Sequence, residues 1–335
     1  MARRSNSNVS LADVAKHAGV SAQTVSRVAN GSDAVRPETR ERVLAAMEQL
    51  GYRPSFAARS LRAGRYHIVG LALPNDLSAT GRRLQLESIV TAATDRQYAV
   101  TLLELGAEDM SLARASRRME SLPVDGQILG LGSHTADFDT FVPPSSIPTV
   151  LVSTRPHPRC ATVSNDQAGC STTIVDYLVS KGHREIRFAG GRREAPANDG
   201  RFEGWEQAMR AHGLALREPL FGDWTADSGY RMGTIFARDE SCTAIYAAND
   251  AMAVGIIYAL RDAGLRVPED VSVIGVDDSM VGVIPRLELS SFRFDEEQVG
   301  LAAFNLAIDP PAGELPHILI PGALVERSTV APPSR

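Results

Sequence analysis

The stretch from Ser10 to Asn30 reads SLADVAKHAGVSAQTVSRVAN and predicts two short helices joined by a tight turn. Ser10 stands three residues before Asp13, a spacing in which a serine side chain caps a helix and the acid caps the serine backbone in return. Gly19 ends the first helix, and Ser21 is placed to cap the second. The pattern is that of a helix-turn-helix.

The second of these helices has an apolar face and a polar face. Val25, Val28 and Ala29 recur at helical spacing and are expected to pack against Val14 and Ala15. The opposite face carries short or forked polar side chains, namely Gln23, Thr24, Ser26 and Arg27. Such groups reach base edges and phosphates when the first turns of a helix lie in the major groove of DNA. A solvated helix face has the same composition.

A third helix is predicted in the segment from Val35 to Gly51, VRPETRERVLAAMEQLG. Pro37 suits the first helical position, and Gly51 ends the helix. An apolar stripe is expected to complete a small three-helix core through Val43, Leu44, Met47 and Leu50.

These segments, with GYRP and AARSLR after them, resemble the DNA-binding headpiece of the LacI-type bacterial transcriptional regulators. The resemblance implies that Tyr52-Arg53-Pro54 leads into a hinge helix at Ser55 to Arg62, which in the family orders on the operator. It also implies that Leu61 wedges into the minor groove, where the bend and the added contacts compensate for base unstacking. A core leucine in an interdomain linker is the alternative for Leu61.

The residues expected to contact DNA divide by chemistry. Gln23 and Ser26 are predicted to contact bases. Contacts to phosphate or sugar are predicted for Ser21, Thr24, Arg27 and Asn30. The resemblance adds Ser10, Leu11, Ala22, Arg36, Thr39, Tyr52, Ser55, Ala58, Arg59 and Leu61. Ala22 stands where one family member has a base-reading tyrosine, so the operator need not be shared. Arg36 and Ser55 also depart from the family's usual residues, and Arg36 adds a charge that attracts phosphate.

Charge is spread unevenly along the chain. Residues 1 to 63 hold ten Lys or Arg against five Asp or Glu, a net of +5, whereas the whole chain carries −5, so residues 64 to 335 carry −10. A basic head on an acidic body is typical of a protein that binds nucleic acid at one end. An anionic membrane surface is the alternative partner, but no amphipathic run of basic and aromatic residues occurs there.

Composition and length place the chain among globular proteins. With 335 residues, 44% hydrophobic and 22% charged, two or three domains are expected. The start, MARRSNSNVS, has no apolar signal core, and no run is long enough to span a membrane. We therefore expect a cytoplasmic bacterial protein, nucleoid-associated when bound to DNA. Cys160, Cys170 and Cys242 lack metal-type spacing, so reduced thiols and no metal or cofactor are expected.

Beyond Arg65, apolar strands alternate with amphipathic helices. Strands are predicted at 67–73, 99–104, 126–131 and 149–153, with helices at 81–96 and 109–121. A second set has helices at 168–181, 201–212, 228–237 and 251–263 and strands at 185–189, 243–247 and 271–276. This alternation predicts parallel sheets built from βαβ units. Two such sheets imply two lobes and a cleft, where ligands bind at the carboxyl ends of strands.

Polar pairs follow the strands predicted at 161–163, 243–247 and 271–276, on the cleft side of what we interpret as a single lobe. They are Asn165-Asp166, Asn249-Asp250 and Asp277-Asp278. With Arg201 and Trp224 they supply the aromatic plate and hydrogen-bonding groups of a carbohydrate pocket. Several have a structural alternative: Asn249 and Asp250 can cap the next helix, Asp277 or Asp278 can cap a turn, and Trp224 can belong to the core.

The family resemblance continues through the body, in GRFEGWEQAM, TAIYAANDAMAVG, VPEDVSVIGVDDS and SSFRFDEEQVG. It implies that Arg201, Asn249 and Asp277 hold the effector, that Trp224 stacks on sugar as in galactoside-responsive members, and that Phe294 faces the effector. The full set of expected effector-binding residues is Asn165, Asp166, Arg201, Trp224, Asn249, Asp277 and Phe294. The polar loop NDLSATGRRL after Pro74 differs from typical members, which leaves the effector open.

The implied fold is an all-α helix-turn-helix headpiece plus an α/β two-lobed periplasmic-binding-protein-like body with parallel sheets. The headpiece spans 1–54, the hinge 55–64, and the effector-binding and dimerisation domain 65–335. The N-lobe is expected at about 65–158 and 292–319, and the C-lobe at about 159–291 and 320–332. Crossovers are expected near 155–163, 290 and 320. No leucine heptads accompany the ending VERSTVAPPSR, so no coiled-coil tetramer is expected.

We therefore expect a homodimeric repressor that places two headpieces on a palindromic operator and senses a sugar or glycoside. The coupling between the two sites should be roughly 1–3 kcal/mol and reciprocal. Trp224 favours a sugar inducer. The alternative is a regulator of the same family with a nucleobase or phosphorylated metabolite as corepressor.

Two other classes of protein share parts of this pattern. A sugar-binding transport protein has the two-lobed body, but it needs a secretion signal and has no helix-turn-helix. An NAD-dependent enzyme has alternating strands and helices, yet no GxGxxG follows a first strand, and GLGS near Gly130 is a poor match. His183, in KGHREI, has no partnered carboxylate at a plausible site. No enzymatic activity is expected.

Overall fold

The computed structural model describes residues 9–29, 34–52, 64–74, 80–106, 111–130, 135–281, 283–286 and 288–334. The chain divides into two compact units, Met1–Tyr66 and His67–Arg335. The predicted hinge helix at Ser55 to Arg62 lies outside the described residues. Among the described helices, none is long and apolar enough to cross a bilayer.

The first unit holds three helices, α1 (Leu11–Ala18), α2 (Ala22–Ala29) and α3 (Pro37–Leu50). The capping box predicted for α1 is present, since the Asp13 amide donates to Ser10 Oγ at 3.3 Å and the Ser10 amide donates to Asp13 Oδ2 at 2.8 Å. Ser21 Oγ accepts from the Thr24 amide at 3.2 Å. Gly19 and Gly51 end α1 and α3 in the left-handed conformation, which glycine adopts without steric cost.

The headpiece core is small and apolar. Val14, Val25 and Val43 are fully buried, one from each helix. The prediction for α3 was wrong at Leu44, which is 50% exposed. Because successive helical residues are 100° apart, the buried face set by Val43 is continued by Ala46 and Met47, and Leu44 falls at its edge.

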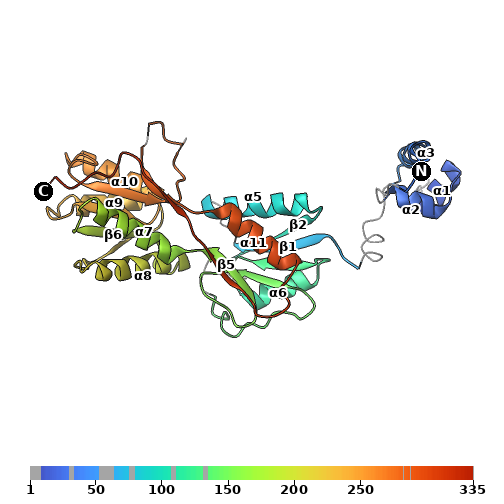
Figure 1. Ribbon diagram of the computed structural model, residues 1–335, viewed down its shortest axis with the longest axis horizontal. Helices are drawn as coiled ribbons and strands as arrows, with labels where there is room; N and C mark the ends of the chain where they lie inside the picture. Colours follow the sequence, from blue (N-terminus) through green and yellow to red (C-terminus); the bar gives the residue numbers. More distant parts are fainter. Residues whose placement is uncertain are drawn as a thin grey trace, which may run out of the picture. The chain divides into compact units, whose positions relative to one another are not determined.

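The first sheet of the body has six parallel strands in the order β11-β5-β4-β3-β1-β2 (Figure 1). Its strands are β1 (Ile68–Pro74), β2 (Ala99–Leu105), β3 (Gly126–Leu129), β4 (Thr149–Val152), β5 (Ala161–Asn165) and β11 (His317–Ile320). Helices α5 (Thr80–Asp95) and α11 (Glu296–Ile308) share one apolar cluster with the sheet, and α6 (Leu112–Glu120) shares another. We call this assembly the N-lobe.

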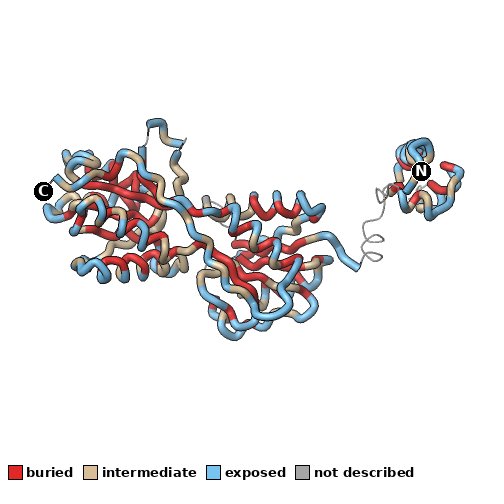
Figure 2. Tube along the Cα trace, in the orientation of Figure 1, coloured by how far each residue is buried: buried red, intermediate tan, exposed pale blue. Residues whose placement is uncertain are grey.

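The second sheet, with its helices, forms the C-lobe. Its strand order is β12-β10-β9-β8-β6-β7, and β12 alone runs antiparallel to its neighbour. The strands are β6 (Ile186–Gly190), β7 (Leu220–Phe221), β8 (Ala244–Ala247), β9 (Ser272–Val276), β10 (Ser290–Arg293) and β12 (Ala323–Val325). The helices are α7 (Gln167–Ser180), α8 (Pro196–Ala211), α9 (Ala226–Phe236) and α10 (Asp250–Asp262). The central strands β6, β8 and β9 are buried along their whole length (Figure 2), as expected for a parallel sheet covered by helices.

The first crossing between the lobes lies later than predicted. Strand β5 pairs with β4 and β11 in the N-lobe sheet, so the chain leaves the N-lobe after Asn165 rather than near 155–163. The interpretation that three strand ends share one lobe was therefore wrong, because β5 ends in the N-lobe and β8 and β9 end in the C-lobe. The second crossing follows β10 at Arg293, and the third separates β11 from β12.

Candidate functional site

The polar face of α2 is available for contact. Gln23 and Arg27 are exposed, and Thr24 and Ser26 are half-buried. The hydroxyl groups of Ser10 and Ser21 already serve as helix caps. Ala22 and Arg36 are exposed, Thr39 is half-buried, and Leu11 and Tyr52 pack against the headpiece core. The other predicted DNA contacts, Asn30, Ser55, Ala58, Arg59 and Leu61, lie outside the described residues.

Arg201 is the centre of the site in the body. It rises from α8 with only 5% of the residue exposed. Its Nε donates to Gln167 Oε1 at 2.7 Å, its Nη1 donates to the Ala248 carbonyl, and its Nη2 lies 3.4 Å from Asp277 Oδ1. Gln167 opens α7, Ala248 follows β8 and Asp277 follows β9, so this one guanidinium joins three strand-end segments.

Two aromatic rings flank the guanidinium. The Arg201 Cζ atom lies 5.7 Å from the centroid of Trp224 and 5.2 Å from that of Phe294. Asn249 holds the main chain of the tryptophan, since its Nδ2 donates to the Trp224 carbonyl at 3.0 Å. Its Oδ1 accepts from the Met252 amide and caps α10. Asn249 therefore caps a helix, as the structural alternative predicted, and also contacts the main chain of Trp224.

The backbone near these residues is strained. Trp224 and Asp277 have φ angles of +74° and +95°, which residues other than glycine rarely adopt. Such strain is found at binding and catalytic sites, where the surrounding structure holds a side chain in a fixed direction. Burial raises the pKa of Asp277, and the charge of Arg201 opposes this effect.

The neighbouring acids have structural partners. Asp166 caps α7 by accepting from the Gly169 amide at 2.8 Å. Asp250 is buried and accepts from the Ser279 amide and from Ser291 Oγ, each at 2.6 Å. Asp278 pairs with Arg327 at 2.7 Å. Among the predicted strand-end acids, Asp277 is the one that meets the guanidinium of Arg201.

Glu296 was missed by sequence reasoning. It is buried at the start of α11, and its carboxyl accepts from Gln85 Nε2 at 2.6 Å and from Asn165 Nδ2 at 2.8 Å. Burial raises its pKa to about 7. An acid in the first turn of a helix is common, because the helix dipole favours it there. Nothing in the pattern DEE distinguished it from Glu297, which is exposed.

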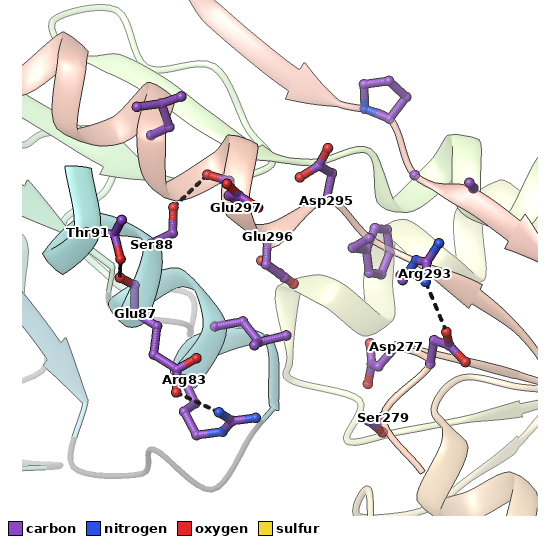
Figure 3. Close-up of a pocket in the computed structure, with 18 of the residues that line it drawn as sticks. Arg83, Glu87, Ser88, Thr91, Asp277, Ser279, Arg293, Asp295, Glu296 and Glu297 are labelled. Carbon is purple, nitrogen blue, oxygen red and sulfur yellow. Dashed lines mark hydrogen bonds and ion pairs between the residues drawn. The ribbon is translucent and has the colours of Figure 1, made fainter. Parts of the chain in front are cut away.

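A cavity of about 1000 Å³ adjoins this assembly (Figure 3). One wall is a face of α5, and the opposite wall includes Asp277, Ser279 and Phe294. Its acidic lining residues are Glu87, Asp95, Asp277, Asp278, Asp295, Glu296 and Glu297, and its basic ones are Arg83 and Arg293. The lining meets the Arg201 assembly at Asp277 and Phe294. Within the described part of the chain, no group of His, Cys, Asp and Glu is placed to hold a metal ion.

The close packing of the Trp224 ring against Gly191 gives a first prediction. A Cβ atom on Gly191 would overlap the indole, and the Gly191 amide is fixed by Asn198 Oδ1 at 2.9 Å. Gly191→Ala should therefore displace the ring, shift the tryptophan fluorescence and cost about 1–3 kcal/mol of stability. Gly106→Ala is the control, because a Cβ there meets no atom within 4 Å. An unchanged emission spectrum in Gly191→Ala would contradict this account of the ring.

The buried carboxyl of Glu296 gives a second prediction. Its pKa rises from 4.5 to about 7 on folding, so the folded protein binds more protons in that window and loses stability as the pH rises through it. The stability of wild type relative to Glu296→Gln should fall by about 2 kcal/mol between pH 5 and pH 8. Denaturant unfolding across this range measures it, with the exposed Glu297→Gln as control. If the difference in unfolding free energy between wild type and Glu296→Gln does not change with pH, the burial of an ionisable carboxyl at this position is contradicted.

The chain matches two family models. Residues 10–55 match the model described as bacterial regulatory proteins, lacI family, and residues 175–330 match that of a periplasmic binding protein-like domain. Catabolite control protein A of Priestia megaterium is 32% identical over 323 residues, covering 92% of this chain and 97% of that protein.

Solved structures agree with these matches. The lac repressor dimer bound to operator and the anti-inducer ONPF superposes with a TM-score of 0.79 at 26% identity, over 96% of this chain and 99% of that one. A complex of the transcriptional regulator CelR with cellobiose gives a TM-score of 0.69 at 28% identity, over 96% and 99%. The chain is thus similar, over nearly its whole length, to proteins with a helix-turn-helix headpiece and a two-lobed body.

Proposed function

Because this chain belongs to the LacI family of bacterial regulatory proteins, it is a DNA-binding transcriptional regulator, and we propose that it represses carbohydrate-utilisation genes until a sugar or glycoside releases it from its operator. The observation that carries the proposal is the Arg201 assembly, in which a buried guanidinium is flanked by Trp224 and Phe294 and paired with Asp277. Stacking rings beside charged hydrogen-bonding groups suit the apolar faces and hydroxyls of a sugar. The CelR relative is in complex with cellobiose, which supports the same class of effector.

On DNA, we propose that a homodimer places one α2 helix in each half of a palindromic operator. The lac repressor relative is a dimer bound to operator, which supports this arrangement. Dimer symmetry then dictates two inverted half-sites. Gln23 and Ser26 are assigned to base edges, and Ser21, Thr24, Arg27 and Asn30 to phosphate or sugar. Because operators lie in the cytoplasm of bacteria, we propose that the protein acts there, on the nucleoid when it is bound to DNA.

Effector binding is proposed to close or twist the N-lobes of the dimer, which separates the hinge segments and withdraws Leu61 from the minor groove. A coupling of roughly 1–3 kcal/mol between the two sites suffices for a 5- to 150-fold change in DNA affinity, and it must be reciprocal. A nucleobase or phosphorylated metabolite acting as corepressor is the second candidate. It would strengthen operator binding instead of weakening it.

Thermal unfolding of the purified protein with mono- and disaccharides, sugar phosphates and nucleobases tests the proposal. A ligand at 100 times its Kd adds about 2.7 kcal/mol to the stability of the folded state. Stabilisation by a neutral sugar or glycoside is the expected result. Stabilisation by nucleobases or phosphates alone would contradict the sugar effector and favour the second candidate, a nucleobase or phosphorylated metabolite that acts as corepressor.

A further inference from the structure

The N-lobe holds a group of hydrogen-bond acceptors next to the cavity, formed by Asn165 and by Glu296, which lines it. Asn165 ends β5 with 3% of the residue exposed, and its Nδ2 donates to Glu296 Oε1 at 2.8 Å. Its Oδ1 is buried and has no hydrogen-bond partner among the described residues. A buried acceptor without a donor is costly, and binding sites are where such groups are retained for a ligand.

Glu296 extends this group into the cavity, whose lining it joins (Figure 3). An ionised carboxylate offers about four acceptor positions, and Gln85 and Asn165 occupy two of them. The first turn of α5 comes close to this carboxyl, since a Cβ on Gly81 would lie 2.7 Å from Glu296 Oε1. A larger residue at position 81 would therefore collide with the carboxyl of Glu296.

The charges around the cavity restrict what can bind. The guanidinium of Arg201 is already paired with Asp277, and the two basic lining residues are also paired, Arg83 with Glu87 at 2.6 Å and Arg293 with Asp278 at 3.6 Å. Glu296 faces the cavity with amide donors and no paired cation among the described residues. The lining carries seven acidic residues against two basic ones, so a negatively charged group of a ligand would lie among like charges.

We propose that Glu296 and Asn165 form the N-lobe half of the effector site and select a carbohydrate that donates hydrogen bonds, either neutral or carrying an ammonium group, while phosphorylated and carboxylated sugars are excluded. Hydroxyl or ammonium donors of the ligand occupy the remaining acceptor positions of Glu296, whose carboxyl Asn165 holds in place. The proposal rests on the proposed sugar-sensing function and assigns its ligand class. Glu296 is then a specificity-determining residue on the lobe opposite Arg201.

Isothermal titration with matched sugars tests this selection. The probes are glucose, galactose and mannose, each as the parent sugar, the 2-amino sugar and the 6-phosphate, together with cellobiose, maltose and lactose. The tightest binder should be a neutral or amino sugar. Glu296→Gln should weaken its binding at least about tenfold, whereas the matched Glu297→Gln, at the exposed neighbouring position, should stay within about twofold.

A second variant protects the test against misfolding. Glu296→Asp keeps the charge but withdraws the carboxyl from the cavity, and it should also lose at least about tenfold in affinity. Tightest binding of a 6-phosphate, or an equal loss in the 296 and 297 variants, would overturn the inference.

The selection by Glu296 and the sugar-sensing function can be tested separately. If a 6-phosphate binds and alters DNA affinity, small-molecule sensing stands and the selection by Glu296 falls. If none of the probes binds, the selection falls together with the sugar-sensing function, while DNA binding measured by fluorescence anisotropy still reports on the headpiece.

Discussion

Replacing Arg201 with alanine should abolish the response to sugar while leaving DNA affinity within about twofold of wild type. The guanidinium holds Gln167, the Ala248 carbonyl and Asp277 together, and its removal leaves the half-buried charge of Asp277 without its partner. Removing one partner of a fully buried pair costs about 3–5 kcal/mol, and the cost here should be smaller because Asp277 is 26% exposed. The headpiece has its own core, so it should keep its DNA affinity as long as the body stays folded.

Arg187→Ala is the matched control for this variant. Arg187 is also a buried C-lobe arginine, 4% exposed, and it pairs with Asp239 at 2.6 Å and Glu185 at 2.9 Å. Its loss should destabilise the body comparably and leave sugar affinity intact. Sugar titration and anisotropy on both variants separate the two effects. Equal loss of sugar binding in both, or loss of DNA binding in Arg201→Ala alone, would contradict the assigned pocket.

The second large effect is expected at Gln23 in the headpiece. If this exposed side chain contacts a base edge, Gln23→Ala should weaken operator binding by about 1–3 kcal/mol and relax the preference at one base pair. Non-specific binding should hardly change, because it comes from phosphate contacts. Gln49→Ala removes a glutamine from α3 that pairs with His17 at 2.8 Å, and serves as control. A uniform loss on specific and random DNA would show that Gln23 does not read sequence.

The headpiece could be predicted from its sequence because its signals are local. The Ser10–Asp13 capping box, the Ser21 cap and the glycine ends all form within one helical turn. The prediction that Leu44 is buried was wrong because helical spacing alone does not determine how α3 packs against the other helices. Of the neighbouring apolar residues Val43 and Leu44, this packing buries Val43.

The body was predictable in class and less so in detail. Alternating patterns gave parallel sheets in two lobes, but strand β5 was assigned to the wrong lobe. Which sheet a strand joins depends on pairing with β4 and the distant β11, and no local pattern records that pairing.

The candidate site, like the body, could be predicted from the sequence only in part. Arg201, Trp224, Asn249, Asp277 and Phe294 could be named in advance and lie in one connected set of contacts. Glu296 could not, because its burial arises from Gln85 and Asn165, which are 211 and 131 residues away in the chain. An acid at a helix start has an ordinary local explanation, so only the tertiary structure reveals its burial and its partners.

The most direct test of the account is the effect of sugar on operator affinity. Duplexes selected from a random pool by the full-length protein can be titrated by fluorescence anisotropy at fixed salt, with and without the tightest-binding sugar. The account predicts selected duplexes with two inverted half-sites, bound at least about a thousandfold more tightly than scrambled DNA, and a sugar-induced loss of about 5- to 150-fold. Equal affinity for scrambled DNA, or an operator affinity that the bound sugar leaves unchanged, would contradict it.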